Sequence, residues 1–316
     1  MYEQYYGLRE RPFDMLSNAK YLLLTPKHQE ALSNLDFGLS GANGITLLIG
    51  EAGTGKTTLL RKALAPYMRR SAARPACWVH LTNPVLKRDE FLESLAHGFQ
   101  LSPQASGSKT RLLRELEEML VQHHEHGIAS LLILDEAQSL PNELLEEVRL
   151  LANLESDTAK LLRVVMAGQP ALGTRLNEPG LYQLKQRVGL RCTLSPLALK
   201  ETSAYIAHRI WLAGGSPEHA FTRDAVLAIH ERSGGIPRTV NVICDNALLT
   251  GYAAEERPVG PAIVKEVCID FDLHRQPAAH GLSVLRQAAP QSEGATAGAR
   301  NAGRGAFSRY LHARSR

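Results

Sequence analysis

One stretch near the start of the chain, residues 50–57, constrains the fold more than any other. It begins with a glycine, continues with four residues and ends in Gly-Lys-Thr, which is the pattern of a phosphate-binding loop. The apolar, β-branched run 45–49 precedes it, and residues 58–64 have the composition of a helix. Strand, loop and helix therefore follow one another in the order that such a loop requires. The residues predicted to bind phosphate are Gly50, Glu51, Ala52, Gly53, Thr54, Gly55, Lys56, Thr57 and Thr58.

The residue types of this loop suit a polyphosphate. Glycines allow positive φ and a close approach of backbone N–H groups to negative charge, next to the N-terminus of a helix. We expect Lys56 to reach the β- and γ-phosphates of a nucleoside triphosphate, and the Thr57 hydroxyl to hold a magnesium ion. The other interpretation is a glycine-rich turn without a ligand, but the flanking strand and helix favour the phosphate-binding one.

The composition bounds the class of protein. The chain has 316 residues, enough for two domains, and its 44% hydrophobic and 22% charged residues are typical of a globular protein. No apolar run approaches the roughly 18 residues of a membrane span, and the N-terminus lacks the apolar core of a secretory signal, so we expect a cytoplasmic protein. The four cysteines form no CxxC pair, which favours buried free thiols over a metal site or disulfides.

The basic character of the chain is concentrated at its C-terminus. The net charge is +4, but residues 275–316 hold seven arginines and one acid, so the remaining residues sum to about −2. This tail is rich in Ala, Gly, Gln, Ser and Arg, and we expect it to be disordered or to fold on a partner, with 307–314 as a small basic helix. DNA phosphates and anionic lipid headgroups are both suitable partners for such a tail.

The N-terminal 41 residues are predicted to form a segment of their own. A helix should begin after Thr25, which is a suitable N-cap with Pro26 at the first helical position, and should end near Gly41. Upstream of it lie the aromatic residues Tyr5 and Phe13. They either cover the adenine ring of a nucleotide or anchor the N-terminus to the core, and composition does not separate the two interpretations.

Strand and helix signals alternate from residue 42 to residue 195 and then change. Alternation of this length predicts an α/β fold, a doubly wound parallel sheet with helices on both faces. After residue 195 the strand signals stop, which predicts a helical second domain over 196–273 and leaves 274–316 as the tail. The predicted strands are 45–49, 76–81, 131–134, 162–167 and 186–194, and the helices of the second domain are 198–213, 222–233, 237–254 and 260–271.

Polar residues follow the apolar strands of the predicted sheet at their carboxyl ends, where ligands of open α/β sheets bind. Asp135 and Glu136 follow the third strand, and Gln169 follows the fourth. We expect Asp135 to bind magnesium and Glu136 to act as the general base towards water. In the second domain, a Gly-Gly-Ile-Pro-Arg run places Arg238 in the first turn of a helix.

These motifs, in their order and spacing over about residues 1–272, resemble those of AAA+ ATPases, and within them of the ExeA/GspA-type secretion ATPases. The resemblance implies that Gln169 is the first sensor and Arg238 the second, and that Arg187 is an arginine finger for a neighbouring subunit. It also implies that Asn83 holds Glu136 inactive until a partner binds. Arg187 in an ordinary ion pair and Asn83 as a turn cap are the alternatives. The matching stretches are 5–8, 12–13, 28–32, 50–58, 82–84, 134–138, 167–170, 186–187 and 234–238.

The function implied by this resemblance is magnesium-dependent ATP hydrolysis by a homo-oligomer. One setting is assembly of a secretion, pilus or polysaccharide-export apparatus at the inner membrane through a protein partner. A second is action on DNA, as in the transposition and origin-binding ATPases, and a third is a slow nucleotide switch. Full-length secretion ATPases of this type carry a membrane span and a periplasmic peptidoglycan-binding part after the ATPase body. The present sequence departs from that pattern, because only a short basic tail follows, so we expect a short form without the periplasmic part and without a direct role at the cell wall.

Overall fold

A computed structural model describes residues 1–14, 19–41, 44–68, 75–82, 85–156 and 159–273. These described residues belong to one compact unit. The predicted basic tail, including the helix expected at 307–314, lies outside the described residues. So does Asn83. In the described part of the chain, no helix is both long enough and apolar enough to cross a bilayer.

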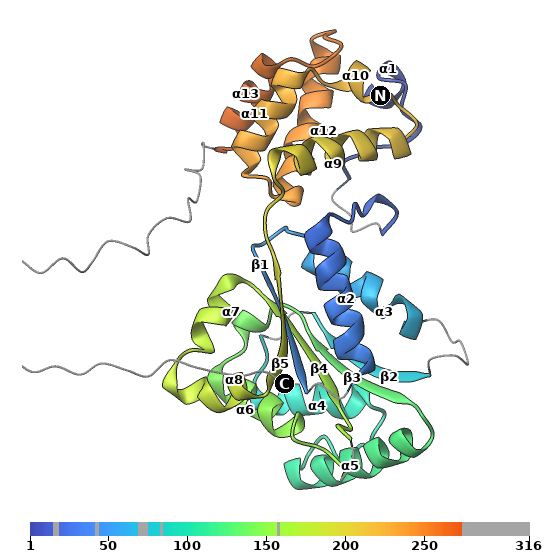
Figure 1. The fold of residues 1–316 in the computed structure, drawn as a ribbon, viewed down its shortest axis with the longest axis vertical. Helices are drawn as coiled ribbons and strands as arrows, with labels where there is room; N and C mark the ends of the chain where they lie inside the picture. The colour runs from blue at the N-terminus through green and yellow to red at the C-terminus, as the bar shows by residue number, and fades with distance from the viewer. Residues whose placement is uncertain (15–18, 42–43, 69–74, 83–84, 157–158, 274–316) are drawn as a thin grey trace, which may run out of the picture. The chain divides into compact units, whose positions relative to one another are not determined.

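The centre of the fold is a five-stranded parallel sheet in the order β2-β3-β4-β1-β5 (Figure 1). β1 is buried along its whole length, because it pairs with β4 on one side and β5 on the other and is covered on both faces. The predicted parallel α/β sheet is confirmed. Its strands are β1 (Ile45–Gly50), β2 (Ala76–Leu81), β3 (Ala129–Leu134), β4 (Arg163–Gly168) and β5 (Val188–Leu194).

Helices cover both faces of this sheet, as the alternation of apolar side chains along β1 requires. Leu47 packs into one hydrophobic cluster with residues of α4–α8, and its neighbour Leu48 packs into another with α2 and α3. Figure 1 shows α2 and α3 together on one side of the strands. The helices are α2 (Pro26–Ser40), α3 (Lys56–Met68), α4 (Arg88–Gly98), α5 (Lys109–Glu125), α6 (Asn142–Leu151), α7 (Pro170–Arg175) and α8 (Tyr182–Gln186).

After β5 the chain forms a helical bundle with its own hydrophobic cluster. Its four longer helices agree with the predicted ranges to within one residue at each end. The short α10, like α1 and α8, was not predicted, because four or five residues are too few to show helical periodicity. The bundle consists of α9 (Leu199–Leu212), α10 (Pro217–Ala220), α11 (Arg223–Ser233), α12 (Pro237–Ala253) and α13 (Pro261–Asp270).

The first 13 residues, including α1 (Tyr2–Tyr5), pack into the hydrophobic cluster of this bundle. The Tyr6 hydroxyl donates to the Glu256 carbonyl at 3.0 Å, and Arg209 Nε donates to the Pro12 carbonyl at 2.5 Å. Helix α2, by contrast, packs into a cluster of the sheet. The chain between them, around the 3₁₀ turn Ala19–Tyr21, therefore passes from one hydrophobic cluster to the other.

The predicted caps account for two of the helix boundaries that frame the site. Thr25 accepts a hydrogen bond from His28 N, and Pro26 occupies the first helical position of α2. Helix α11 ends at Gly234 with φ 58°, and Gly235 follows with φ 73°. A Cβ at Gly235 would lie 2.1 Å from the Leu197 carbonyl oxygen, so this turn has no room for a side chain.

Candidate nucleotide site

The loop between β1 and α3 has the backbone conformation that its glycines predict. Gly53 and Gly55 have φ values of 82° and 97°. A Cβ on Gly53 would lie 2.7 Å from Arg238 Cβ, so the glycine also allows α12 to approach the loop. Thr54 Oγ1 donates to the Glu51 carbonyl at 2.8 Å and closes the turn. The loop therefore presents its backbone towards the N-terminus of α3, the arrangement that binds anions.

Lys56 lies inside this loop with only 4% of its surface exposed. Its Nζ donates to the carbonyls of Gly50 at 2.9 Å and Glu51 at 3.1 Å. Burial lowers the pKa of the Lys56 ammonium, and the charge of Glu136 is the largest of the carboxylate effects that oppose this shift. A cation held at the centre of the loop by carbonyl oxygens is placed to contact a phosphate that enters it.

The structure brings the acids that follow β3 to this loop. Asp135 is 3% exposed, and its Oδ2 accepts a hydrogen bond from Thr57 Oγ1 at 2.6 Å. Its other oxygen, Oδ1, accepts from Glu136 N at 3.0 Å. The two residues expected to hold magnesium are thus in direct contact although they are 78 positions apart.

The donor set around Thr57 and Asp135 suits magnesium. One hydroxyl and one carboxylate are few ligands, but this ion keeps several waters and takes its remaining oxygens from substrate phosphates. No described group of three or more His, Cys, Asp or Glu is arranged to hold a metal by itself. The chemistry of the residues present therefore fits an ion that arrives with a nucleotide.

Glu136 and Gln169 meet at the carboxyl ends of β3 and β4. Glu136 has a left-handed backbone with φ 53°, and its side chain lines the pocket. Its Oε2 accepts hydrogen bonds from Gln169 Nε2 at 3.4 Å and from Gln138 Nε2 at 2.5 Å. Gln169 itself is the N-cap residue of α7. The predicted general base, Glu136, and the predicted first sensor, Gln169, are therefore neighbours.

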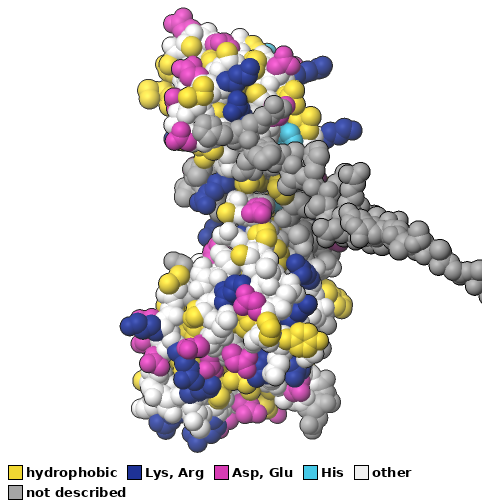
Figure 2. Space-filling view, turned by 90° about the vertical axis from the view of Figure 1, so that its left-hand side faces the viewer, with side chains coloured by type: hydrophobic (Ala, Val, Ile, Leu, Met, Phe, Trp, Pro, Cys, Tyr) yellow, Lys and Arg dark blue, Asp and Glu magenta, His cyan; other side chains and the backbone are white. Residues whose placement is uncertain are grey.

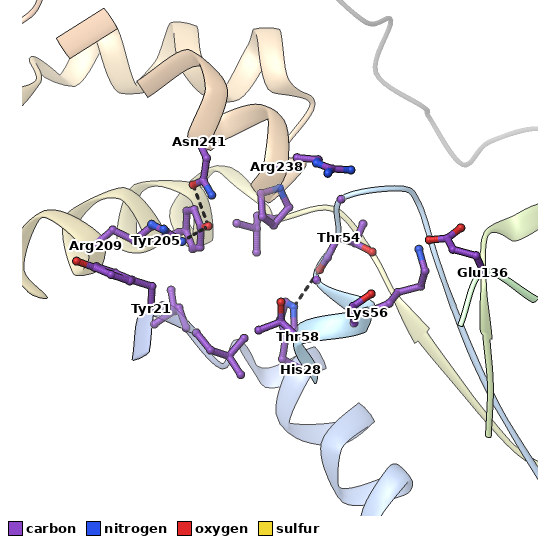
Figure 3. Close-up of a pocket in the computed structure, with 17 residues that line it drawn as sticks. Tyr21, His28, Thr54, Lys56, Thr58, Glu136, Tyr205, Arg209, Arg238 and Asn241 are labelled. Atoms are coloured by element: carbon purple, nitrogen blue, oxygen red, sulfur yellow. Dashed lines mark hydrogen bonds between the residues drawn. The ribbon is translucent and has the colours of Figure 1, made fainter. Parts of the chain in front are cut away.

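The pocket joins this phosphate-binding loop to the helical bundle (Figure 3). Arg238 lies in the first turn of α12, as predicted, and its backbone N–H donates to the Gly53 carbonyl at 3.3 Å. Its side chain is one of those that line the pocket. The lining residues are Tyr21, Leu22, Leu23, His28, Gly53, Thr54, Gly55, Lys56, Thr57, Thr58, Glu136, Leu197, Tyr205, Arg209, Pro237, Arg238 and Asn241.

The end of the pocket away from Lys56 carries two tyrosines. We call it the base end, meaning the end where a nucleobase would lie; it consists of Tyr21, Tyr205, Arg209 and Asn241. The Arg209 guanidinium lies 4.6 Å from the Tyr21 ring centroid and 5.3 Å from that of Tyr205. Arg209 Nη1 donates to the Tyr205 hydroxyl at 2.8 Å, which donates to Asn241 Oδ1 at 3.0 Å. Burial raises the pKa of the Tyr205 hydroxyl, so this group stays a donor.

Tyr5 and Phe13 are not among the residues that line the pocket, and the expectation that they cover adenine has to be corrected. Phe13 is fully buried in the cluster of the helical bundle, with its ring 6.3 Å from that of Phe221. Tyr5 packs edge-on against Tyr252 of α12 at 5.5 Å. Burying these rings in the bundle anchors the N-terminus, which is the second of the two interpretations that the sequence left open.

Arg187 does not reach the pocket of its own chain. It is the exposed C-cap residue of α8, directly before β5. The register pairs Ile45 with Val188 and Gly50 with Leu194, so Arg187 lies at the N-terminal ends of the strands, whereas the loop follows their C-terminal ends. A strand of this length separates the two ends by roughly 20 Å.

Six polar or aromatic residues of the site were not predicted from the sequence: Gln138 and the pocket residues Tyr21, His28, Tyr205, Arg209 and Asn241. Gln138 follows the two acids by two positions, and this proximity was a usable signal. The others come from elements far apart in the chain. Of these, only His28 lies in a stretch that matches the family, 28–32, and the arrangement in space is what identifies all of them as pocket residues.

Comparison with known proteins agrees with this geometry. Residues 40–176 match a family model described as an AAA domain. The chain is 39% identical over 253 residues to General secretion pathway protein A of Aeromonas hydrophila. This match covers 80% of the present chain and 45% of the relative, so the chain spans less than half the length of that protein.

Solved structures with a similar fold include Cdc6p from Pyrobaculum aerophilum, with a TM-score of 0.59 and 18% identity. The match covers 78% of this chain and 68% of that one. The ORC2 protein of Aeropyrum pernix gives a TM-score of 0.57 at 17% identity, covering 83% and 72% of the two chains. At these identities the likeness concerns the fold alone, which it confirms.

Proposed function

The protein belongs to the AAA ATPases related to General secretion pathway protein A, and we propose that it hydrolyses ATP, with magnesium bound, at the pocket described above. The observation that carries this assignment is the 2.6 Å hydrogen bond between Thr57 and Asp135. It joins the phosphate-binding loop to the strand that also supplies Glu136. Burying a carboxylate costs free energy, and a turn that binds no ligand would gain nothing from placing one beside that hydroxyl.

Each residue of the site has a distinct task in this proposal. Thr57 and Asp135 hold the magnesium ion, which when bound supplies charge neutralisation for the phosphates. Lys56 contacts the β- and γ-phosphates from within the loop, and the loop N–H groups donate hydrogen bonds to the phosphate oxygens. Glu136 takes a proton from the attacking water as general base. Gln169 senses the γ-phosphate, and Arg238 contributes positive charge from α12.

We propose that Arg187 acts in the site of a neighbouring copy. Its position at the opposite end of the strands excludes the pocket of its own chain, and the residue is exposed. Arginine fingers supplied in this way contribute about 10³ to 10⁵ in rate. Turnover per chain should consequently rise with protein concentration, and Arg187→Ala should remove that rise. Turnover that does not depend on concentration would contradict the oligomeric part of the proposal.

The chain then divides into an ATPase core over 42–195, a lid domain over 196–273 and a basic tail over 274–316. Separate hydrophobic clusters in the sheet and the bundle support the first division. The N-terminal segment 1–41 contributes to both, since residues 1–13 pack with the bundle and α2 with the sheet.

For the biological role, we propose an oligomeric motor or switch that acts from the cytoplasm, peripheral to the inner membrane, in assembly of a secretion, pilus or export apparatus. The 39% identity to a general secretion pathway protein supports this setting. DNA association is the alternative, suggested by the basic tail and by the resemblance of the motifs to those of transposition and origin-binding ATPases. On the face drawn in Figure 2, basic and acidic side chains of the described residues are interspersed and form no basic stripe.

The decisive experiment separates binding from hydrolysis. Lys56→Ala should lose ATP binding. Glu136→Gln should bind ATP with little change and lose turnover, because this substitution removes the general base but no contact to the phosphates. Steady turnover by Glu136→Gln equal to that of the unmodified protein would defeat the assignment. Repeating the assay with duplex DNA and with anionic vesicles tests the setting. Salt-sensitive stimulation by DNA would favour the alternative role.

A further inference from the structure

The Glu136 side chain is held by amide groups on one of its two oxygens. Among the described residues, the two donors to its carboxylate, Gln138 Nε2 and Gln169 Nε2, both reach Oε2. The shorter contact, at 2.5 Å, comes from Gln138. The long side chain of a glutamate has several rotamers, so such a contact selects a direction for the carboxylate.

The other end of the Gln138 amide is also engaged. Its Oε1 accepts a hydrogen bond from Gln169 N at 3.0 Å. This contact decides the orientation of the amide, because a flipped group would face that N–H with its own NH₂ and would turn its oxygen towards the Glu136 carboxylate. The side chain of Gln138 therefore bridges the carboxylate that follows β3 and the backbone that follows β4.

The surroundings of this bridge are built to receive it. A Cβ at Gly168 would lie 2.9 Å from Gln138 Oε1 and 2.8 Å from Leu172 Cδ2, so the absence of a side chain there leaves space for the amide. The backbone of Gln138 is fixed as well, since Arg175 Nη1 donates to its carbonyl at 2.7 Å. Arg175 Nη2 donates to Asn142 Oδ1 at 2.5 Å. Both the backbone and the side chain of Gln138 are thus tied to α7 or to the turn before it.

We propose that Gln138 is a positioning residue for hydrolysis: it holds Oε2 of Glu136, so that Oε1 is directed to the attacking water, and it couples this carboxylate to the strand end that carries Gln169. This inference rests on the proposed function, because it concerns the carboxylate assigned as general base. Gln138 is not among the residues that line the pocket, so in this proposal it acts through Glu136. A misplacement of about 1 Å at a reacting group can cost on the order of a hundredfold in rate.

Three substitutions in the full chain separate positioning from support of the fold. Gln138→Leu keeps a similar size and removes both contacts. Gln138→Glu keeps the acceptor for Gln169 N but sets a second carboxylate against Glu136. Gln138→His restores one donor and one acceptor. The matched control is Gln122→Leu, at an exposed glutamine of α5.

The measurements are ATP affinity, single-turnover hydrolysis and thermal unfolding. We expect Gln138→Leu to lower the single-turnover rate about 10- to 100-fold and Gln138→Glu to lower it at least as far, with ATP affinity within threefold of the unmodified protein. Gln138→His should recover part of the rate, and Gln122→Leu should change nothing.

Two outcomes overturn the inference and leave the proposed function intact. One is a Gln138→Leu rate within twofold of the unmodified protein while Glu136→Gln is inactive. The other is a fall in the unfolding temperature and in the ATP affinity that parallels the fall in the single-turnover rate, in both Gln138→Leu and Gln138→His. That result would mean that Gln138 supports the fold and does not position Glu136. Activity in Glu136→Gln would instead remove the proposed function itself.

Discussion

The two ends of the pocket are built in different ways. At the phosphate end, one continuous loop supplies backbone N–H groups, a lysine and a hydroxyl, and the two acids that follow β3 lie beside it. At the base end, Tyr205 of α9 and Asn241 of α12 form a hydrogen-bonded chain with the Arg209 guanidinium, which also lies 4.6 Å from the ring centroid of Tyr21. The phosphate end has a lysine and two carboxylates that suit a reaction, whereas the base end has aromatic rings, an amide and one guanidinium that suit recognition.

This difference predicts which substitutions change the rate of ATP hydrolysis and which change the affinity for ATP. Groups that contact charge developing on the phosphates contribute to the transition state. Groups that contact a purine ring bind substrate and transition state equally, so they alter KM or Kd with little effect on kcat. Matched substitutions at the two ends test this division.

The largest effect is expected at the phosphate end. Asp135→Asn keeps an acceptor for Thr57 but removes the negative charge that would hold magnesium. Because a bound metal contributes several kcal/mol to the transition state, we expect kcat to fall at least about a hundredfold, with ATP affinity changed much less. Steady-state hydrolysis over a range of magnesium concentrations measures this.

The control for this prediction is Asp245→Asn, which removes a carboxylate of α12 that binds Tyr2 and Arg11, away from the pocket. It should affect unfolding but leave kcat unchanged. An Asp135→Asn variant with normal kcat and an unaltered magnesium dependence would contradict the assignment of rate effects to the phosphate end.

A smaller effect is expected at the base end. Tyr205→Phe removes the hydroxyl that accepts from Arg209 and donates to Asn241. Without the hydroxyl, Arg209 and Asn241 no longer hold each other in place for the nucleobase; if binding ATP must restore an order worth about 1 to 3 kcal/mol, the Kd for ATP rises roughly 5- to 140-fold with kcat nearly constant. Equilibrium titration with ATP and with inorganic tripolyphosphate measures it.

Tripolyphosphate sharpens this test because it lacks a base. Its affinity should be the same for Tyr205→Phe and for the unmodified protein, and Tyr252→Phe, at an exposed tyrosine of α12, should change neither titration. Equal weakening for ATP and tripolyphosphate would show that the hydroxyl supports the whole pocket and not its base end.

The two ends also differ in how far the sequence predicts them. The phosphate end is local in sequence: the glycines of residues 50–55 set the loop, and apolar strands ending in acids place Asp135 and Glu136 beside it. Parallel pairing brings such strand ends to one edge, so the sheet and this half of the site follow from periodicity and motif spacing.

The base end depends on tertiary packing that no local pattern encodes. Tyr5 and Tyr21 are both tyrosines of the N-terminal segment, yet the first packs on α12 and the second lines the pocket. What decides between them is how residues 1–13 pack with the bundle before the chain turns towards α2. Tyr205 and Asn241 are 36 positions apart, and only the packing of α9 against α12 makes them a pair.

The smallest expected effect concerns His28, which lies between the two ends. The imidazole contacts Thr25 Oγ1 at 2.7 Å and the Thr54 carbonyl at 3.5 Å, and burial lowers its pKa from the ordinary 6.5. Below pH 6.5 the unfolded chain therefore binds more protons at this position than the folded chain. The free energy of unfolding should fall as the pH decreases through this range, by at most about 1.4 kcal/mol per pH unit for one proton.

Replacing His28 by glutamine keeps a donor and an acceptor but removes the titration, so the decline in stability between pH 7.5 and pH 5.5 should become shallower. Urea unfolding at several pH values measures the slope. His80, His123 and His230 also have pKa values lowered by burial, so part of the decline should remain. His97→Gln, at an exposed imidazole, is the control. Equal slopes for His28→Gln and the unmodified protein would mean that His28 is protonated without cost, and that its contact with the phosphate-binding loop does not depend on the neutral ring.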